Sequence, residues 1–245
     1  MNGQIEKFAG PIRFVYVVVG TMAETEPTLI AIGGGGATHG THPELDRLCL
    51  SVAGEQPRIG YIGTASGDDP EKYQNFIAGF QSLAAEVLPL PSGADAVQAR
   101  RWVGGLDLIY VGGGNPVRLV DHWNATGVGA VLLDAARGGT PLAGVSAGAM
   151  CWFESFLWRS ERNGLQVSKG LGLVQGAMTP HSLTEPDRRT HMLKCVGRGE
   201  MAAGYAVDDG AALLIRGGTA RAFPPSGPPH IYLIDPALGE TCLSG

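Results

Sequence analysis

The stretch Pro141–Met150, PLAGVSAGAM, joins an apolar run to a turn of small residues centred on Ser146. Its middle part, GVSAG at 144–148, has the G-x-S-x-G pattern of a nucleophile elbow, in which a strand turns directly into a helix. The glycines leave room for the strained backbone that lifts such a serine above the sheet. A helix beginning at Ala147 would present unpaired N–H groups to an oxyanion. The alternative is a tight turn whose serine only caps the helix.

Upstream of Ser146, apolar runs alternate with segments of helical character. The expected strands lie at 28–36, 58–66, 86–90, 107–114 and 141–145, and the expected helices at 43–52, 70–85, 94–103, 115–124 and 128–137. This alternation predicts an α/β fold with a mostly parallel sheet and helices on both faces. Ligands of such sheets bind beyond the carboxyl ends of the strands. Three of those ends are unusual here, at 33–36, at 112–115 and at Ser146, and we expect them to line one crevice.

The pattern is less regular after Ser146. We expect the helix from Ala147 to continue to Phe156, a polar loop over 158–170 and a helix over 185–196. Short apolar runs near the end of the chain predict antiparallel β-strands, because turn residues separate them. With no linker, repeat or low-complexity segment in view, we predict a single α/β domain over 28–245. Residues 1–27 would form an N-terminal extension or an edge strand.

Composition narrows the class of protein. The 245 residues carry a formal net charge of −5, with no basic cluster, so a nucleic-acid partner is not expected. The apolar run Phe14–Ala23 weakly resembles a signal peptide and is too short to span a bilayer, so no membrane partner is expected either. The four cysteines show no paired spacing, which predicts reduced thiols in a cytoplasmic protein. The sequence leaves open whether the protein forms a homodimer.

A nucleophilic serine needs a base, and the base needs a third group to orient it. From the residues alone, His181 and His230 are the candidate bases, because each follows a proline that fixes the backbone. Either Asp208 or Asp209 could supply the acid. The other histidines include a loop pair, at 39 and 42, that lacks clear partners for a metal, so neither a metal nor a cofactor is expected.

Four segments carry a family resemblance: IYVGGGN at 109–115, GVSAGA at 144–149, TPH at 179–181 and GYAVDDG at 204–210. In this order they resemble the peptidase E (aspartyl dipeptidase) and cyanophycinase family of serine peptidases, in particular its bacterial peptidase E-like branch. The resemblance extends from about Thr28 to Asp235. It implies a fold related to class I glutamine amidotransferases and an enzyme that acts on short peptides, with Asp-X dipeptides among the candidate substrates.

The resemblance also implies roles for single residues. Ser146 would be the nucleophile, His181 the base and Asp209 the acid of a catalytic triad. The N–H groups of Gly114 and Ala147 would form the oxyanion hole. The residues that would bind the substrate are Asn115, Glu161, Arg188 and Arg189.

The sequence departs from the family pattern in three places. The family's acid is typically glutamate, whereas an aspartate stands here, so that both Asp208 and Asp209 stay candidates. Ser182 replaces an aromatic residue that often follows Pro-His. Arg159 stands near the place where many members carry an aspartate, which leaves the preference for an N-terminal aspartate open.

Three functions follow as hypotheses. The first is a serine exopeptidase or dipeptidase. The second is an esterase of the α/β-hydrolase type, whose order of serine, acid and histidine would be met by Ser146, Asp209 and His230. The third is a non-catalytic, ligand-binding member of the fold. A capping serine does not explain the glycines at 112–114, which favours the peptidase.

Overall fold

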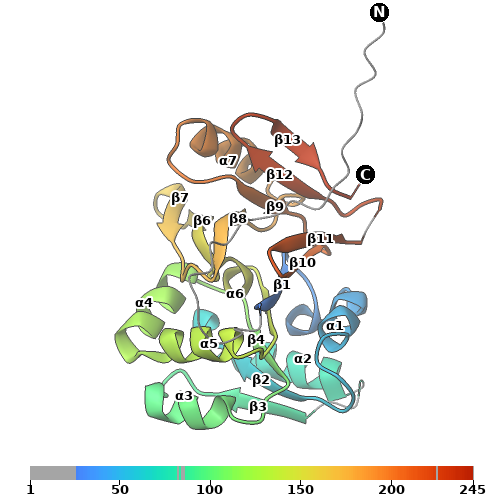
Figure 1. The fold of residues 1–245 in the computed structure, drawn as a ribbon, viewed down its shortest axis with the longest axis vertical. Helices are drawn as coiled ribbons and strands as arrows, with labels where there is room; N and C mark the ends of the chain where they lie inside the picture. Colours follow the sequence, from blue (N-terminus) through green and yellow to red (C-terminus); the bar gives the residue numbers. More distant parts are fainter. Residues whose placement is uncertain (1–25, 82, 84–85, 225, 245) are drawn as a thin grey trace, which may run out of the picture.

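The computed structural model describes residues 26–81, 83, 86–224 and 226–244. The predicted extension or edge strand at 1–27 therefore falls, except for its last two residues, outside the described residues. The described part of the chain forms two β-sheets, which Figure 1 shows one above the other. The larger sheet has the strand order β11-β10-β1-β5-β4-β2-β3, and the smaller one β13-β12-β9-β8-β6-β7.

Five neighbouring strands of the larger sheet are parallel, as the alternating pattern predicts. They are β1 (Thr28–Ile32), β5 (Leu142–Val145), β4 (Leu108–Val111), β2 (Arg58–Ile62) and β3 (Glu86–Leu90). The sheet is extended by β10 (Ala212–Arg216) and β11 (Thr219–Phe223), both joined in antiparallel fashion. The expected C-terminal antiparallel strands are therefore present.

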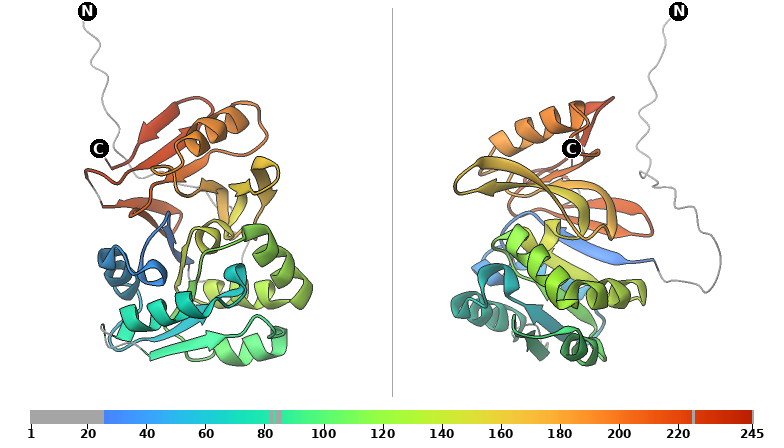
Figure 2. Two further views of the ribbon diagram at one scale, coloured as in Figure 1. Left: turned by 180° about the vertical axis from the view of Figure 1, so that it is seen from behind. Right: turned by 90° about the vertical axis from the view of Figure 1, so that its left-hand side faces the viewer.

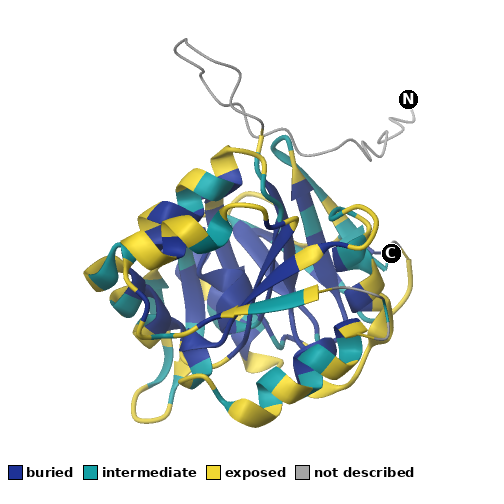
Figure 3. Cartoon of the chain, turned by 90° about the horizontal axis from the view of Figure 1, so that it is seen from below, coloured by how far each residue is buried: buried dark blue, intermediate teal, exposed yellow. Residues whose placement is uncertain are grey.

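Helices cover both faces of this sheet because successive strand residues point to opposite faces. From β1, Ile30 and Ile32 pack with α1 (Pro43–Leu50) and α2 (Pro70–Gln81). Leu29 and Ala31 pack on the other face with three helices: α3 (Ala96–Val103), α4 (Pro116–Thr126) and α5 (Val128–Arg137). Figure 3 shows the buried strands between helices whose outer surfaces are exposed.

Helix starts are set by side chains that the sequence makes available. Asp95 and Gln98 form a reciprocal capping box at the start of α3, and Asn115 accepts a hydrogen bond from Arg118 N at the start of α4. Asp69 accepts from Glu71 N before α2. Among the helices of the described residues, none is long and apolar enough to cross a membrane.

The segment after Ser146 differs from the prediction. The helix α6 (Ala147–Met150) has four residues, and the chain then enters β6 (Phe153–Ser160) instead of continuing as helix to Phe156. The expected loop over 158–170 is the second half of β6 and its hairpin partner β7 (Gly164–Lys169). Both predictions were wrong because pairing between distant strands, which no local pattern reports, decides the structure of this segment.

The smaller sheet is completed by β8 (Val174–Thr179), β9 (Gly204–Val207), β12 (Ile231–Asp235) and β13 (Gly239–Cys242), with α7 (Asp187–Gly197) beside it. One hydrophobic cluster contains Leu29 and Val111 of the larger sheet together with Phe153, Met178 and Tyr205 of the smaller one. The two views in Figure 2 show the smaller sheet lying over one end of the larger. The two sheets thus share buried side chains.

Candidate active site

Ser146 lies directly after β5 in a backbone conformation that a non-glycine residue rarely adopts. Its φ is 54° and its ψ is −112°, and its N–H donates to Ile32 O at the end of β1 at 2.9 Å. Strained backbone of this kind persists only where the surrounding structure enforces it, and it is often found at functional sites. The serine side chain is thereby held at the carboxyl end of the sheet.

The two glycines that flank Ser146 are required by close backbone approaches. A Cβ on Gly144 would overlap Gly148 O and would lie 3.0 Å from Ala149 N. A Cβ on Gly148 would overlap Val111 O, at the end of β4, and would lie 2.6 Å from its carbonyl carbon. The turn from β5 into α6 is therefore as tight as the sequence pattern predicts, since only glycine fits at either flank.

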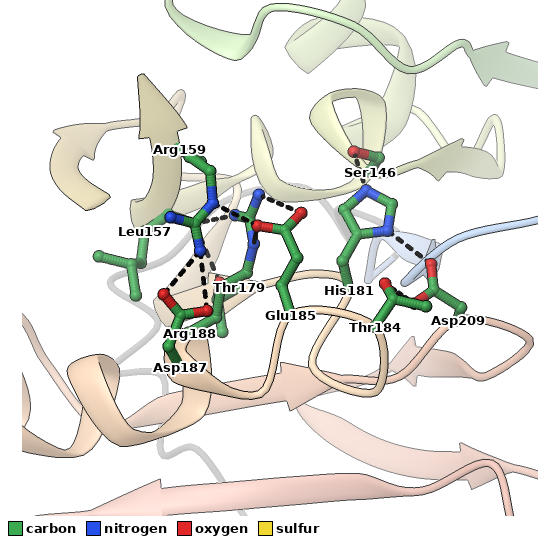
Figure 4. A network of polar contacts seen from close by, with 10 residues as sticks. All are labelled: Ser146, Leu157, Arg159, Thr179, His181, Thr184, Glu185, Asp187, Arg188 and Asp209. Atoms are coloured by element: carbon green, nitrogen blue, oxygen red, sulfur yellow. Dashed lines mark hydrogen bonds and ion pairs between the residues drawn. The ribbon is translucent and has the colours of Figure 1, made fainter. Parts of the chain in front are cut away.

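His181 follows β8 of the smaller sheet and approaches the serine from across the crevice. It also has a positive φ, of 57°. Its Nε2 lies 2.8 Å from Ser146 Oγ, and its Nδ1 lies 2.5 Å from Asp209 Oδ1 (Figure 4). Such a line of hydrogen bonds lets an imidazole accept a proton from the hydroxyl while the carboxylate holds the ring in one tautomer.

Asp209 follows β9 and is held by a residue that the sequence does not single out. Thr184 Oγ1 donates to Asp209 Oδ2 at 2.7 Å, so that both carboxylate oxygens have a partner. Burial works against the ionised form, but the hydrogen bonds from His181 and Thr184 outweigh it and lower the pKa of Asp209 to about 2. Asp209 is therefore an ionised carboxylate at neutral pH.

The neighbouring aspartate points elsewhere. Asp208 is buried and accepts from Ser182 Oγ at 2.5 Å and from His230 N at 2.9 Å. His230 itself lies beside Ser244, with Nδ1 and Oγ 3.2 Å apart. The structure thus pairs His181 with Asp209, and it does not bring His230 to Ser146. The constellation required by the esterase hypothesis is absent from these described residues.

The glycine-rich loop after β4 lies beside Ser146, as expected for neighbouring strand ends. A Cβ on Gly113 would lie 3.4 Å from Ser146 Cβ. Gly114 has a φ of +154° and packs so tightly that a Cβ there would lie 2.8 Å from Ser66 N. Ala147 is the first residue of α6, where a helical N–H has no acceptor within the helix. The structure therefore places both candidate oxyanion residues next to the serine in sequence or in space.

A pocket of about 450 Å³ opens next to Ser146 and His181. The remaining residues that line it are Gly114, Asn115, Pro116, Met150, Trp158, Arg159, Ser160, Glu161, Arg162, Glu185 and Arg188. Three of the four candidate substrate-binding residues are thus in the lining. The fourth is not, because Arg189 pairs with Glu240 at 3.0 Å and stacks on Tyr232. The prediction that Arg189 lies at the site is therefore corrected.

An ion-pair network fixes one wall of this pocket (Figure 4). Arg159 Nε donates to Glu185 Oε2 at 2.5 Å, and its Nη2 contacts both carboxylate oxygens of Asp187. Arg188, which is buried, also pairs with Glu185, with Nη2 and Oε1 3.1 Å apart. The network ties β6 to the start of α7. Glu185, which lines the pocket, and Asp187, which lies behind Arg159 in the network, are residues whose part the sequence did not indicate.

Comparison with known proteins identifies the family of enzymes to which the protein belongs. Residues 29–223 match the model of the family described as Peptidase family S51. Since this match covers most of the chain, the protein belongs to peptidase family S51, and it is a serine peptidase. The family resemblance inferred from the four motifs is confirmed.

Two curated relatives support the assignment. The chain is 39% identical over 191 residues to a protein of Bacillus subtilis (strain 168) named "Uncharacterized peptidase YgaJ", covering 76% of this chain and 81% of that protein. It is 34% identical over 87 residues to "Peptidase E" of Streptomyces coelicolor (strain ATCC BAA-471 / A3(2) / M145), where the match covers 35% of this chain and 36% of that protein.

Solved structures support the fold. A peptidase from an acI-B1 Actinobacterium superposes with a TM-score of 0.72 at 23% identity, covering 91% of this chain and 96% of that one. A putative peptidase E protein from Listeria monocytogenes EGD-e superposes with a TM-score of 0.61 at 19% identity, covering 80% and 98%. The predicted mixed α/β fold is thereby confirmed, and it is consistent with the class I glutamine amidotransferase type.

Proposed function

We propose that this peptidase hydrolyses short peptides with Ser146 as nucleophile, His181 as general base and acid, and Asp209 as the group that orients His181. The observation that carries the proposal is the continuous line of hydrogen bonds from Asp209 through His181 to Ser146 Oγ. The strained backbone at Ser146 and the lowered pKa of Asp209 support it. Perturbed carboxyl groups paired in a crevice are common at catalytic sites.

The chemistry follows from this geometry. His181 Nε2 accepts the proton as Ser146 Oγ attacks the peptide carbonyl, and the imidazolium then gives that proton to the leaving nitrogen. The C–N bond breaks and an acyl–serine ester remains. Water, deprotonated by the same nitrogen, attacks the ester, and the serine recovers its proton as the acid is released. No step of this sequence needs a metal ion or a cofactor.

The negative charge that develops on the carbonyl oxygen needs fixed donors. We assign these to the N–H groups of Gly114, which lines the same pocket as the serine, and of Ala147, which follows it at the start of α6. The contact of Gly113 with Ser146 and the tight packing of Gly114 on the chain at 65–66 support a rigid loop at this position. A rigid donor costs no reorganisation when the charge forms, and one such hydrogen bond contributes roughly a hundredfold or more to turnover.

The pocket next to Ser146 is the proposed place for the acyl residue of the substrate, with Asn115, Glu161 and Arg188 as contacts. Two of its three arginines, Arg159 and Arg188, are paired with Glu185, whereas Arg162 is exposed and is in none of the ion pairs found among the described residues. A substrate carboxylate would therefore compete with these pairs at Arg159 and Arg188, but not at Arg162. The resemblance to the peptidase E (aspartyl dipeptidase) family makes Asp-X dipeptides the first substrates to test.

A dipeptide library assayed on purified protein tests the proposal, with Ser146→Ala as the blank. We expect hydrolysis of one or more dipeptides by the wild type and none above background by the blank. His181→Ala should be nearly inactive and His230→Ala nearly normal, since the members of a triad act as a unit. Hydrolysis that survives in folded Ser146→Ala would contradict the proposal.

A further inference from the structure

The peptide unit that joins Gly113 to Gly114 has a charged partner on one side. Lys72 Nζ, on α2, donates to Gly113 O at 3.3 Å. The unit is trans, because both cis bonds of the described residues precede prolines. In a trans unit the C=O and the N–H point in opposite directions. The N–H of Gly114 therefore points away from Lys72.

The N–H of Gly114 keeps its hydrogen for a ligand. Among the hydrogen bonds found in the described residues, none has Gly114 N as its donor, whereas Gly112 N and Asn115 N donate to carbonyl oxygens at 2.9 Å and 2.8 Å. Gly114 also lines the pocket that contains Ser146. The loop is thus held by the chain on both sides of an unused donor, which is the arrangement that an oxyanion hole requires.

Lys72 brings a charge to this peptide that no carboxylate in the described part of the chain neutralises by an ion pair. Its side chain is half-buried, so water screens the charge less than at an open surface. The carboxylate of Asp69, three residues earlier, accepts from backbone N–H groups at the start of α2. The ammonium of Lys72 therefore acts on the carbonyl of Gly113.

A cation at the carbonyl of a peptide strengthens the N–H of the same peptide. The amide is one delocalised system, so electron density drawn toward the oxygen leaves the nitrogen and its hydrogen more positive. Hydrogen bonds linked in this way strengthen one another by about 10 to 30% each. The effect of Lys72 thus passes through the backbone to the side of the loop where Gly114 N–H is free.

This effect belongs to the transition state. The carbonyl oxygen of a bound peptide is neutral, and it takes up negative charge as the tetrahedral intermediate forms. A stronger donor therefore lowers the barrier more than it improves substrate binding, and its loss appears in kcat more than in affinity.

We propose that Lys72 is a positioning residue for the oxyanion hole, which polarises the Gly113–Gly114 peptide and strengthens Gly114 N–H toward the developing oxyanion. The inference rests on the proposed function, because it assumes that Ser146 is the nucleophile and that Gly114 N–H receives the charge. Lys72 acts through the peptide and takes no part in the proton transfers. If one oxyanion donor contributes roughly a hundredfold or more to turnover, we expect Lys72 to account for about threefold to tenfold of it.

Three substitutions separate the charge of Lys72 from its hydrogen bond. Lys72→Arg keeps both, Lys72→Gln keeps a donor without charge, and Lys72→Met keeps neither. The first measurement is the rate at which a fluorophosphonate labels Ser146, since the phosphoryl oxygen also takes up charge in the transition state. We expect Lys72→Gln and Lys72→Met to be labelled about threefold to tenfold more slowly than wild type, and Lys72→Arg within about twofold of it. Lys194→Gln, at an exposed lysine of α7, is the matched control and should match wild type.

The second measurement compares turnover with binding for the fastest dipeptide of the library. In Lys72→Met, kcat should fall by the same factor as the labelling rate. Calorimetric affinity for the dipeptide, measured with Ser146→Ala present, should stay unchanged by Lys72→Met. A shifted loop would instead weaken binding, because Gly114 lines the pocket.

Several results would overturn the role of Lys72. Wild-type rates in Lys72→Met would show that the charge has no effect, and wild-type rates in Lys72→Gln alone would show that the hydrogen bond merely holds the loop. Lys72→Arg as slow as Lys72→Met, or a loss of affinity as large as the loss of kcat/KM, would also contradict it. In each case a labelled wild type leaves the proposed function standing. A folded wild type that neither takes the label nor hydrolyses a dipeptide would contradict the proposed function and this inference with it.

Discussion

The backbone of Gly34, just beyond β1, lies against the carboxylate of Asp209. A Cβ on Gly34 would overlap Asp209 Oδ1 and would lie 2.9 Å from His181 Nδ1. Gly34 O also accepts from Gly210 N at 2.9 Å, which ties the two strand-end loops together. The backbone at Gly34 therefore packs directly against the side chains of His181 and Asp209.

Gly34→Ala should separate activity from stability. No positive φ opposes alanine at Gly34, and the atoms that must move are the ends of the Asp209 and His181 side chains and not backbone. The displaced carboxylate would no longer orient His181, and we expect turnover to fall roughly a hundredfold or more, while the loss of the Asp209 hydrogen bonds lowers the melting temperature by only a few degrees. Gly197→Ala, at the end of α7 with open space around it, is the control and should be normal in both. Full activity in Gly34→Ala would contradict the role of the Asp209 contact.

The two adjacent aspartates should respond to amide substitution in opposite ways. Asp209→Asn should lower turnover by about three to four orders of magnitude, because an amide can hold His181 in the wrong tautomer. Asp208→Asn should mainly lower stability, by about 1 to 3 kcal/mol, because the buried Asp208 accepts from both Ser182 and His230 N. Turnover with melting curves on both variants distinguishes these outcomes. A severe loss of turnover in well-folded Asp208→Asn would show that the acid is assigned to the wrong residue.

The lowered pKa of Asp209 predicts a pH range in which acid lowers the stability of the folded protein. Because the pKa in the folded state, about 2, lies below the ordinary value of 3.8, ionised Asp209 stabilises the fold above about pH 4. That contribution, about 2 kcal/mol at most, is lost as the pH falls from 4 toward 2. Denaturant unfolding of wild type and Asp209→Asn between pH 2 and 5 measures it. The difference in stability between the two proteins should shrink toward low pH, and a difference that stays constant would contradict the shift.

Much of this arrangement is predictable from the sequence because steric requirements leave local patterns. The glycines at 144 and 148 are needed for one tight turn, and their pattern alone predicts both the elbow and its position after a buried strand. The parallel strands are equally visible, since runs buried on both faces are continuously apolar. Local sequence patterns therefore predict the place of Ser146. The family resemblance is what predicts that His181 contacts the serine.

The remaining parts depend on contacts between distant segments. Adjacent residues at a strand end point in opposite directions, so nothing in the pair Asp208-Asp209 tells which side chain turns toward His181. Thr184 and Gly34 meet Asp209 only because loops from three strands converge. The predicted helix to Phe156 fails for a similar reason, since a short apolar run fits a buried strand as well as a helix.

Covalent labelling tests whether His181 and Asp209 make Ser146 a nucleophile. A fluorophosphonate probe should form a Ser146 Oγ–phosphorus bond with loss of fluoride, because an activated serine attacks phosphorus as it attacks a carbonyl. Mass spectrometry should place the label on the peptide that contains Ser146 in wild type and His230→Ala. Labelling should be strongly slowed in His181→Ala and absent in Ser146→Ala. If the folded wild-type protein takes up no label at Ser146, or if His181→Ala is labelled equally fast, Ser146 is not activated by His181 and the proposed triad is wrong.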